Sequence, residues 1–235
     1  MSGAAVSVRP IATLEEYREC MALQQAAFGY DDRFVEPLTQ LVTAQRYGGH
    51  VLGAFDRDGT ILGYLYSCPG LRDGELLSCF RILAVSPAAR GLGIGERLLL
   101  ALRDRALAAG IRTVVATFDP LEAANARLYL GKLGFRGLRF YPNHYGDLGR
   151  GQNAGLETDR LEIEWTLDAA APTRRAADGE VASGRDAIPR ITALSGGRGE
   201  WPSCTILRLD LDAERLLLEV PASIQALKAA DLGLA

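Results

Sequence analysis

The residues best suited to chemistry form the glycine-rich stretch Arg90-Gly91-Leu92-Gly93-Ile94-Gly95. It follows an apolar, strand-like run at 77–85 and precedes a helical pattern at 94–109 that ends before Gly110. The glycines therefore lie at a helix N-terminus, where the first N–H groups lack intrahelical partners and the dipole favours an anion. Because glycine has no Cβ, a ligand can approach the backbone closely. The stretch predicts a site for a phosphate or pyrophosphate.

The glycine spacing argues against two common phosphate-binding loops. A Walker loop ends in Gly-Lys-Ser/Thr, whereas Gly95 is followed by Glu96. A dinucleotide-binding loop reads Gly-x-Gly-x-x-Gly, whereas the third glycine here comes one residue too early. Two alternatives remain: an anion-binding loop of another kind, and a helix entry that needs glycine only for its backbone geometry.

A second informative segment begins after a strand-like run at 112–118. Asp119 suits an N-cap, Pro120 suits the first helical turn, and Glu122 occupies the capping-box position. These signals predict a helix over 120–133 that ends at Gly134-Phe135.

In this order and spacing, the two segments resemble the GNAT N-acyltransferase superfamily over residues 6–167. The resemblance rests on Ala84-Val85-Ser86-Pro87, on Arg-x-x-Gly-x-Gly at 90–95, and on a helix that closes in Leu133-Gly134-Phe135. It implies that an acyl-CoA binds with its pyrophosphate on the N–H groups of residues 91–95. The pantetheine arm would pair with the backbone where the fourth and fifth strands separate, and a neutral amine would attack the thioester without a metal. The implied CoA-binding residues are Leu83, Ala84, Val85, Arg90, Gly91, Leu92, Gly93, Ile94, Gly95 and Asn125.

The same resemblance implies that Tyr129 is the general acid for the CoA thiolate. Counted back from Gly134-Phe135, however, the family's tyrosine falls on Leu130 and its asparagine on Ala123. A one-residue shift turns an α-helical side chain by about 100°. Asn125 and Tyr129 share a helix face, so they can serve together if the helix is displaced or its last turn is loose. Otherwise Tyr129 is a packing residue and Asn125 a local backbone partner.

The order of elements predicts an α/β (α+β) fold. The GNAT resemblance implies a mixed, mostly antiparallel central sheet flanked by helices. Outside the two motifs, we expect strands at 6–11, 50–55, 60–67, 135–141 and 160–167, and helices at 13–28 and 34–45.

Three parts are expected along the chain: an acyltransferase domain at 1–168, a linker at 169–200 and a small appendage at 201–235. The linker is rich in Ala, Gly and Arg. In the appendage, 201–210 and 215–220 are expected to form a hairpin, with a helix beginning at Pro221. This piece is too small for its own core, so it packs on the main domain or on a second subunit of a homodimer.

The acceptor is less defined by the sequence. Tyr141, Asn143, His144, Tyr145 and Arg150 lie in a long connection that either lines an acceptor pocket or is a mobile surface loop. Three arginines can bind a carboxylate, as an amino acid acceptor would require: Arg81, Arg150 and Arg160. We expect transfer of an acetyl or other short acyl group, such as succinyl, to a small-molecule amine. The alternatives are acetylation of a peptide N-terminus and a non-catalytic acyl-CoA sensor, which the displaced tyrosine favours.

Composition excludes several other classes. The 235 residues are 48% hydrophobic with a formal net charge of −3, which is typical of a globular domain and not of a nucleic-acid binder. No apolar run is long enough for a membrane span, and no secretory signal follows Met1. Because the four cysteines show no metal-binding spacing, we interpret them as reduced thiols of a cytoplasmic protein. Cys79 is either a nucleophile or, as we expect, a small core residue.

Overall fold

The computed structural model describes residues 6–146, 148, 151–168, 188–195, 203–206, 212 and 216–232. The chain divides into two compact units. The first comprises Met1–Phe118 and Phe135–Pro172, and the second comprises Asp119–Gly134 and Thr173–Ala235.

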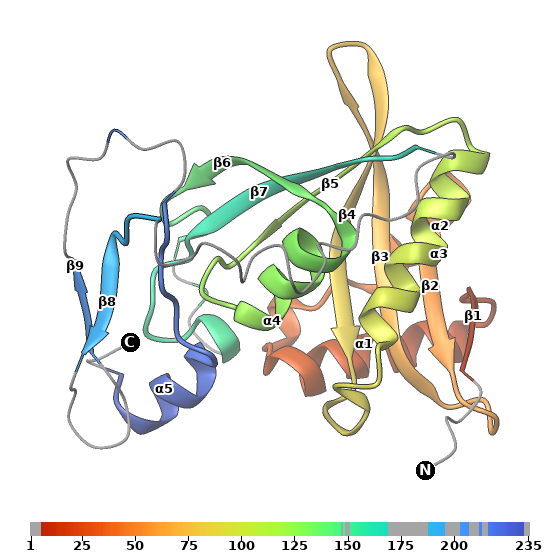
Figure 1. Cartoon of the computed structure of the whole chain (residues 1–235). Helices are drawn as coiled ribbons and strands as arrows, with labels where there is room; N and C mark the ends of the chain where they lie inside the picture. The colour runs from red at the N-terminus through yellow and green to blue at the C-terminus, as the bar shows by residue number, and fades with distance from the viewer. Residues whose placement is uncertain are drawn as a thin grey trace. The chain divides into compact units, whose positions relative to one another are not determined.

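The first unit contains a seven-stranded sheet in the order β1-β2-β3-β4-β5-β7-β6 (Figure 1). Every neighbouring pair is antiparallel except β4 and β5, which are parallel. The predicted mixed, mostly antiparallel sheet is thus confirmed. The strands are β1 (Ser7–Pro10), β2 (His50–Phe55), β3 (Ile61–Arg72), β4 (Glu75–Val85), β5 (Thr113–Phe118), β6 (Arg136–Tyr141) and β7 (Arg160–Thr166).

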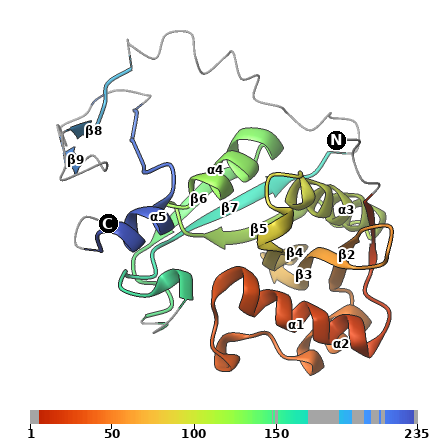
Figure 2. The same cartoon turned by 90° about the horizontal axis from the view of Figure 1, so that it is seen from below.

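Helices cover both faces of the first half of this sheet (Figure 2). On one face, α1 (Leu14–Phe28) and α2 (Leu38–Arg46) bury a core that includes Tyr64 and Tyr66 of β3. On the other, α3 (Ile94–Ala108) packs so closely that a Cβ on Gly63 would lie 2.8 Å from Ile94 Cγ2. Alternate β3 residues thus face opposite helical layers, as the two-residue period of a strand requires.

The start of α1 follows its predicted capping box. The Thr13 side chain accepts a hydrogen bond from the Glu16 N–H at 3.2 Å, and Glu16 accepts one from the Ala12 N–H at 2.7 Å. The helix ends at Gly29 with φ 67°. By contrast, α2 begins at Leu38 and not at 34, because a residue that precedes a proline disfavours helical geometry and Pro37 follows Glu36. Phe34 instead ends the short helix η1 (Asp32–Phe34).

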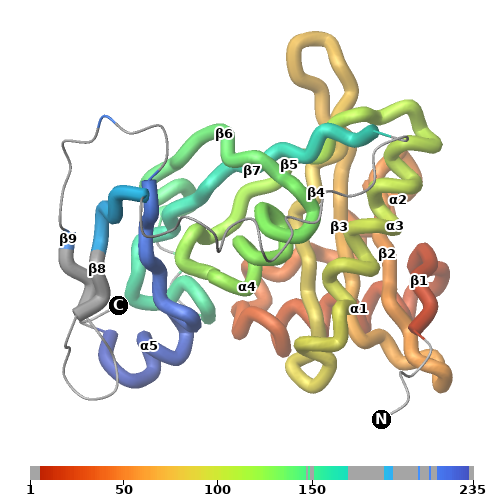
Figure 3. The backbone as a smooth tube through the Cα atoms, in the orientation of Figure 1, coloured from red at the N-terminus to blue at the C-terminus, as the bar shows by residue number. Residues whose placement is uncertain are grey.

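The strands predicted at 60–67 and 77–85 are longer in the structure and form the β3–β4 hairpin, which extends beyond the rest of the sheet (Figure 3). Its turn is Asp73-Gly74, with φ of 53° and 84°. Two positive φ angles are typical of the tight turn that Asp-Gly favours between antiparallel strands. Pro69 and Gly70 conceal the strand pattern in the sequence, yet both are paired in β3.

The second unit contains α4 (Ala123–Ala126), the π-helical segment η3 (Arg127–Leu133), β8 (Thr192–Ser195), β9 (Ser203–Ile206) and α5 (Ile224–Ala230). Of the expected hairpin between 201–210 and 215–220, the structure describes only 203–206 and 216–220. There β9 pairs with β8, which lies within the segment interpreted as a linker. Leu217 instead forms a parallel bridge with Arg190. A four-residue strand in an Ala-, Gly- and Arg-rich stretch is too short to stand out by composition.

Candidate active site

The parallel strands β4 and β5 separate after a short paired stretch (Figure 1). Only Ser78 with Val114 and Cys79 with Val115 are in register. Beyond them β4 keeps its β3 partner as far as Val85, and β5 keeps its β7 partner as far as Phe118. Among the described residues, no strand therefore pairs with Leu83–Val85 on the side of β5. Unpaired strand backbone of this kind can hydrogen-bond an extended ligand arm.

The glycine-rich stretch forms the entry to α3, as predicted. Gly93 is the N-cap with φ 75° and provides no side-chain cap, and Gly91 has φ 82°. The Arg97 N–H bonds to the Gly93 carbonyl, so the N–H groups of residues 94–96 precede the first intrahelical donor. A Cβ on Gly91 or Gly93 would meet no atom within 4 Å. The positive end of this helix therefore has room for an anion.

Other residues of the stretch fix its position. The Arg90 guanidinium donates to the Ala27 carbonyl at 3.0 Å, near the end of α1. Ile94 is buried, whereas Leu92 is 63% exposed. The Arg90 side chain is therefore bound to the protein backbone, and the buried Ile94 fixes the start of α3. The backbone at Gly91 and Gly93 remains accessible to a ligand.

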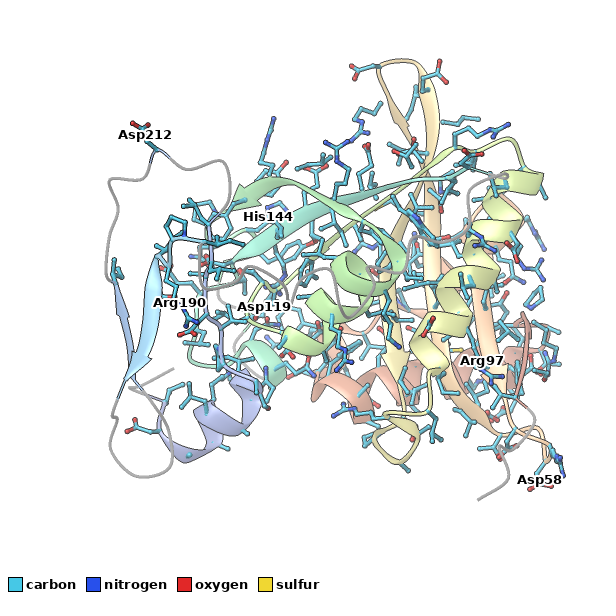
Figure 4. All side chains as sticks on the ribbon, in the orientation of Figure 1. Asp58, Arg97, Asp119, His144, Arg190 and Asp212 are labelled. Atoms are coloured by element: carbon cyan, nitrogen blue, oxygen red, sulfur yellow. The ribbon has the colours of Figure 1, made fainter. Side chains whose placement is uncertain are left out.

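The helix that carries Asn125 begins later than predicted. Asp119 Oδ1 accepts a hydrogen bond from the Leu121 N–H at 2.9 Å, and its carbonyl accepts one from Glu122. Asp119, labelled in Figure 4, thus closes a turn and does not cap a helix at Pro120. The helix therefore begins at Ala123. The sequence did not reveal this, because an aspartate before a proline can either cap a helix or close a turn.

A π-helical turn surrounds Tyr129. The Gly134 N–H bonds to the Tyr129 carbonyl, five residues earlier. A π turn contains one residue more than an α turn, so Tyr129 lies one full turn before Gly134 despite its shifted spacing. The π turn corresponds to the loose last turn that the sequence analysis gave as one of two alternatives for this helix. Tyr129 is buried, and burial raises the pKa of its hydroxyl. Asn125 lies in the preceding turn, where its N–H donates to the Glu122 carbonyl.

A carboxylate that the sequence analysis missed lies beside β4. Tyr66 pairs with Ile82 and Ser67 with Phe80, which leaves Arg81 in a β-bulge. Arg81 Nη2 lies 2.7 Å from Glu36 Oε1. The backbone N–H of Glu36 is in turn held by the buried Gln24 side chain at 2.9 Å. Because 45 residues separate Glu36 from Arg81, no local sequence signal links them.

The long connection after β6 is held by hydrogen bonds around the buried Thr158. Its hydroxyl contacts the Asn143 side chain at 3.2 Å and the Gly146 carbonyl at 2.9 Å. The His144 ring lies 4.8 Å from the Tyr141 ring and 4.5 Å from the Tyr145 ring, measured between centroids. The structure therefore brings four of the five predicted loop residues together, of which His144 is labelled in Figure 4. The fifth, Arg150, lies outside the described residues.

Of the two candidate arginines that the structure describes, Arg160 is the more buried, at 8% exposed. Its guanidinium donates to the Asp159 carbonyl at 2.7 Å and to Asn153 Oδ1 at 2.9 Å, and lies 5.3 Å from the centre of the Tyr145 ring. The Tyr145 hydroxyl is 3.2 Å from Thr117 Oγ1 of β5. Within the part of the chain that the structure describes, no carboxylate forms an ion pair with Arg160, whereas Arg81 is paired with Glu36.

The described residues contain no group of three or more His, Cys, Asp or Glu side chains arranged to hold a metal ion. None of their helices has the length and apolar character needed to span a membrane.

Comparison with known proteins identifies the family. Residues 12–135 match the Acetyltransferase (GNAT) family, so the chain belongs to that family. No curated protein matches the sequence significantly.

Many solved structures share the fold. A putative acetyltransferase from Acinetobacter baylyi is 18% identical with a TM-score of 0.59, covering 74% of this chain and 99% of its own. A putative acetyltransferase from Salmonella typhimurium, solved with its cofactor acetyl-CoA, is 24% identical with a TM-score of 0.55, covering 73% and 99%. The ribosomal-protein-S18-alanine N-acetyltransferase from Escherichia coli is 17% identical with a TM-score of 0.56, covering 72% and 99%.

Proposed function

We propose that this chain transfers an acetyl or other short acyl group from acyl-CoA to the primary amine of a small molecule, such as an amino acid. The observation that carries the proposal is the β4–β5 separation next to the uncapped glycine entry of α3. Family membership supports acyl transfer, and the Salmonella typhimurium relative was solved with acetyl-CoA.

In this proposal, the two ends of the opening hold the two ends of the CoA arm. The pyrophosphate accepts hydrogen bonds from the N–H groups of residues 91–95, where the helix dipole adds to the attraction. The pantetheine amides pair with the backbone of Leu83–Val85, as an added strand would. Asn125 contributes a further polar contact. The thioester is thereby aimed along the opening towards the acceptor.

The reaction is a direct attack in which positioning supplies much of the acceleration. The neutral amine adds to the thioester carbonyl, and the Val85 N–H stabilises the oxyanion that forms. Collapse of this intermediate breaks the carbon–sulfur bond and expels the CoA thiolate. Tyr129 donates a proton to the thiolate, and water removes the proton from the attacking nitrogen. Glu36 is not assigned the role of base, because its carboxylate forms an ion pair with Arg81.

Arg160 is our candidate for binding a carboxylate on the acceptor. A buried guanidinium is costly without an anionic partner, and an ion pair with a ligand would offset that cost. Its planar donors match a carboxylate in two-point geometry. Two aromatic residues near Arg160 would contact the rest of the acceptor. The charge of Arg160 acts on the Tyr30 hydroxyl, and the Arg160 guanidinium lies 5.3 Å from the centre of the Tyr145 ring.

A peptide N-terminus is the second candidate acceptor. It is favoured by the similarity of the fold to the Escherichia coli ribosomal-protein-S18-alanine N-acetyltransferase. Such an acceptor has no free α-carboxylate beside the reacting amine, so the proposed role of Arg160 separates the two candidates.

A competition screen tests the proposal. The protein is incubated with equimolar acetyl-CoA and succinyl-CoA and with either pooled free amino acids or pooled peptides. Free CoA thiol and product masses are then measured. We expect N-acyl amino acids to appear in proportion to CoA released. Acylated peptides without acylated amino acids would contradict the acceptor class, and tight CoA binding without any product would identify a sensor.

A further inference from the structure

Two cysteines lie directly opposite each other on β3 and β4. Cys68 is in register with Cys79, and both are free and half-buried. Opposed residues on antiparallel strands project from the same face with Cα atoms about 4.5–5.5 Å apart, within the range that a disulfide spans. The Cys68 Sγ already lies 3.7 Å from the Cys79 carbonyl oxygen.

The surroundings make one of the two thiols reactive. A hydrogen bond from Cys79 lowers the pKa of Cys68 to about 6, and the positive charge of Arg81 acts in the same direction. Burial and the nearby Glu36 oppose this shift. Cys79 has the raised pKa of a proton donor, and the charges near it are Arg81 and Glu162. Of the two thiols, Cys68 is therefore the one that more readily forms the thiolate, which is the nucleophilic form of cysteine.

We propose that Cys68 and Cys79 form a redox modification site, which closes to an intramolecular disulfide with a peroxide and is reopened by a dithiol. The Cys68 thiolate attacks a peroxide oxygen, the O–O bond breaks, and a sulfenic acid and hydroxide form. The Cys79 sulfur then attacks the sulfenic sulfur, the S–S bond forms, and water leaves. Two thiols are oxidised while hydrogen peroxide is reduced to two waters.

The position of the pair gives the modification a structural consequence. Cys79 is the last β4 residue in register with β5, so the bond would lie at the base of the proposed CoA opening. It would also replace the Cys68 thiolate, whose negative charge faces Arg81. The third described cysteine, Cys20, differs in both respects, because it is completely buried and burial raises its pKa. Cys20 therefore provides a negative control, a cysteine that should not react with the peroxide.

Peptide mapping of the full chain tests the proposal. Trypsin cuts after Arg57, Arg72 and Arg81, which places Cys68 in peptide 58–72 and Cys79 in peptide 73–81. After hydrogen peroxide treatment and alkylation under denaturing conditions, we expect these two peptides to be joined, with a mass two hydrogen atoms below their sum. Dithiothreitol should separate them. The rate of joining should fall as the pH is lowered from 7 to 5, because protonation removes the Cys68 thiolate.

Two variants make the outcome decisive. Cys20→Ser should preserve the joined peptides, whereas Cys68→Ser should abolish them and leave Cys79 open to alkylation. Separate sulfinic acids on Cys68 and Cys79 would overturn the proposal, as would a linkage to Cys20 or Cys204, or a rate of joining that does not change with pH.

Discussion

Tyr129 has a raised pKa because its hydroxyl is buried, so it keeps its proton above the usual tyrosine range. A proton donor must be protonated when the leaving group departs, and burial secures that state at neutral pH. Because the pKa is raised, we expect no loss of activity from ionisation of Tyr129 between pH 7 and 9.

Tyr129→Phe is expected to lower kcat by about 10²-fold or more, because it removes only the proton that the thiolate requires. The dissociation constant for CoA should change little. Steady-state release of CoA thiol and a CoA titration measure the two effects, with Tyr47→Phe, at an exposed position on another helix end, as the control. Equal turnover of Tyr129→Phe and the unsubstituted protein would rule out the role.

Arg160→Gln is expected to raise KM about 10–100-fold for an amine that carries a carboxylate, since a charge-assisted hydrogen bond contributes about 1.5–3 kcal/mol. For the matching amide, which lacks the charge, KM should be unchanged. Comparison of the two substrates separates binding from structure, because a purely structural defect would affect both equally. That equal effect would refute the carboxylate role.

The position of Tyr129 relative to the end of its helix was ambiguous in the sequence. The sequence places Gly134 five positions after Tyr129, but it does not show whether the chain spans this interval with an α or a π turn. In the structure this interval is a π turn, in which the Gly134 N–H donates a hydrogen bond to the Tyr129 carbonyl. Glu36 and Arg81 were missed for a different reason, because their contact depends on the fold and not on spacing.

At the scale of elements, α1 illustrates a start that the sequence predicts well. Glu16 is 17% exposed, accepts hydrogen bonds from Ala12 and Arg9, and has its pKa lowered to about 2, chiefly by Arg9. A carboxylate with a depressed pKa stabilises the fold above its unfolded pKa, near 4.5, and loses that effect as the pH falls towards 2.

Glu16→Gln is therefore expected to lower the free energy of unfolding at pH 7 by about 0.5–1 kcal/mol, the range for a partly exposed ion pair. The deficit should shrink between pH 4.5 and the folded pKa of about 2. Urea denaturation at several pH values measures it. The neighbouring Glu15→Gln, at a 71% exposed side chain, should have a smaller effect. A deficit that is constant with pH would exclude the Arg9–Glu16 pair as its source.

Other elements were predicted less well, for identifiable physical reasons. Asp119-Pro120 carries the same residues whether it caps a helix or closes a turn, so the helix start was placed three residues early. The pairing of β8 with β9 depends on contacts between distant short segments, which periodicity does not report. Local signals such as caps and Asp-Gly turns are therefore more predictive here than pairing partners.

At the scale of the whole molecule, the family match and the compact units do not coincide. The match covers residues 12–135, yet residues 119–134 cluster with 173–235. Gln225 of α5 donates to Glu122 at 2.7 Å. Burial lowers the pKa of Lys228, while the charges of Asp119 and Glu122 partly oppose the shift. The C-terminal segment thus supports the turn that leads into α4.

Truncation after residue 172 is expected to lower the melting temperature and to reduce kcat, because the segment that carries Tyr129 loses these partners. CoA affinity should be reduced less, since the glycine entry of α3 belongs to the other unit. Thermal unfolding, turnover and CoA titration of the truncated chain measure the three quantities, with Gln225→Ala as a single-contact control. Full activity after truncation would show that the C-terminal segment is dispensable.

Binding of the CoA pyrophosphate at the N-terminus of α3 is best tested with a matched pair of glycine variants. Gly93 and Gly110 lie at opposite ends of α3, have φ of 75° and 78°, and would each place a Cβ in open space. Valine at either position imposes similar backbone strain, of about 1–2 kcal/mol. Calorimetric titration should show a roughly 10²-fold weaker affinity for CoA in Gly93→Val, equivalent to losing one or two charge-assisted hydrogen bonds. Gly110→Val should bind CoA as the unsubstituted protein does. Unchanged CoA affinity in Gly93→Val, or equal losses of CoA affinity in both variants, would show that the pyrophosphate does not bind at the N-terminus of α3.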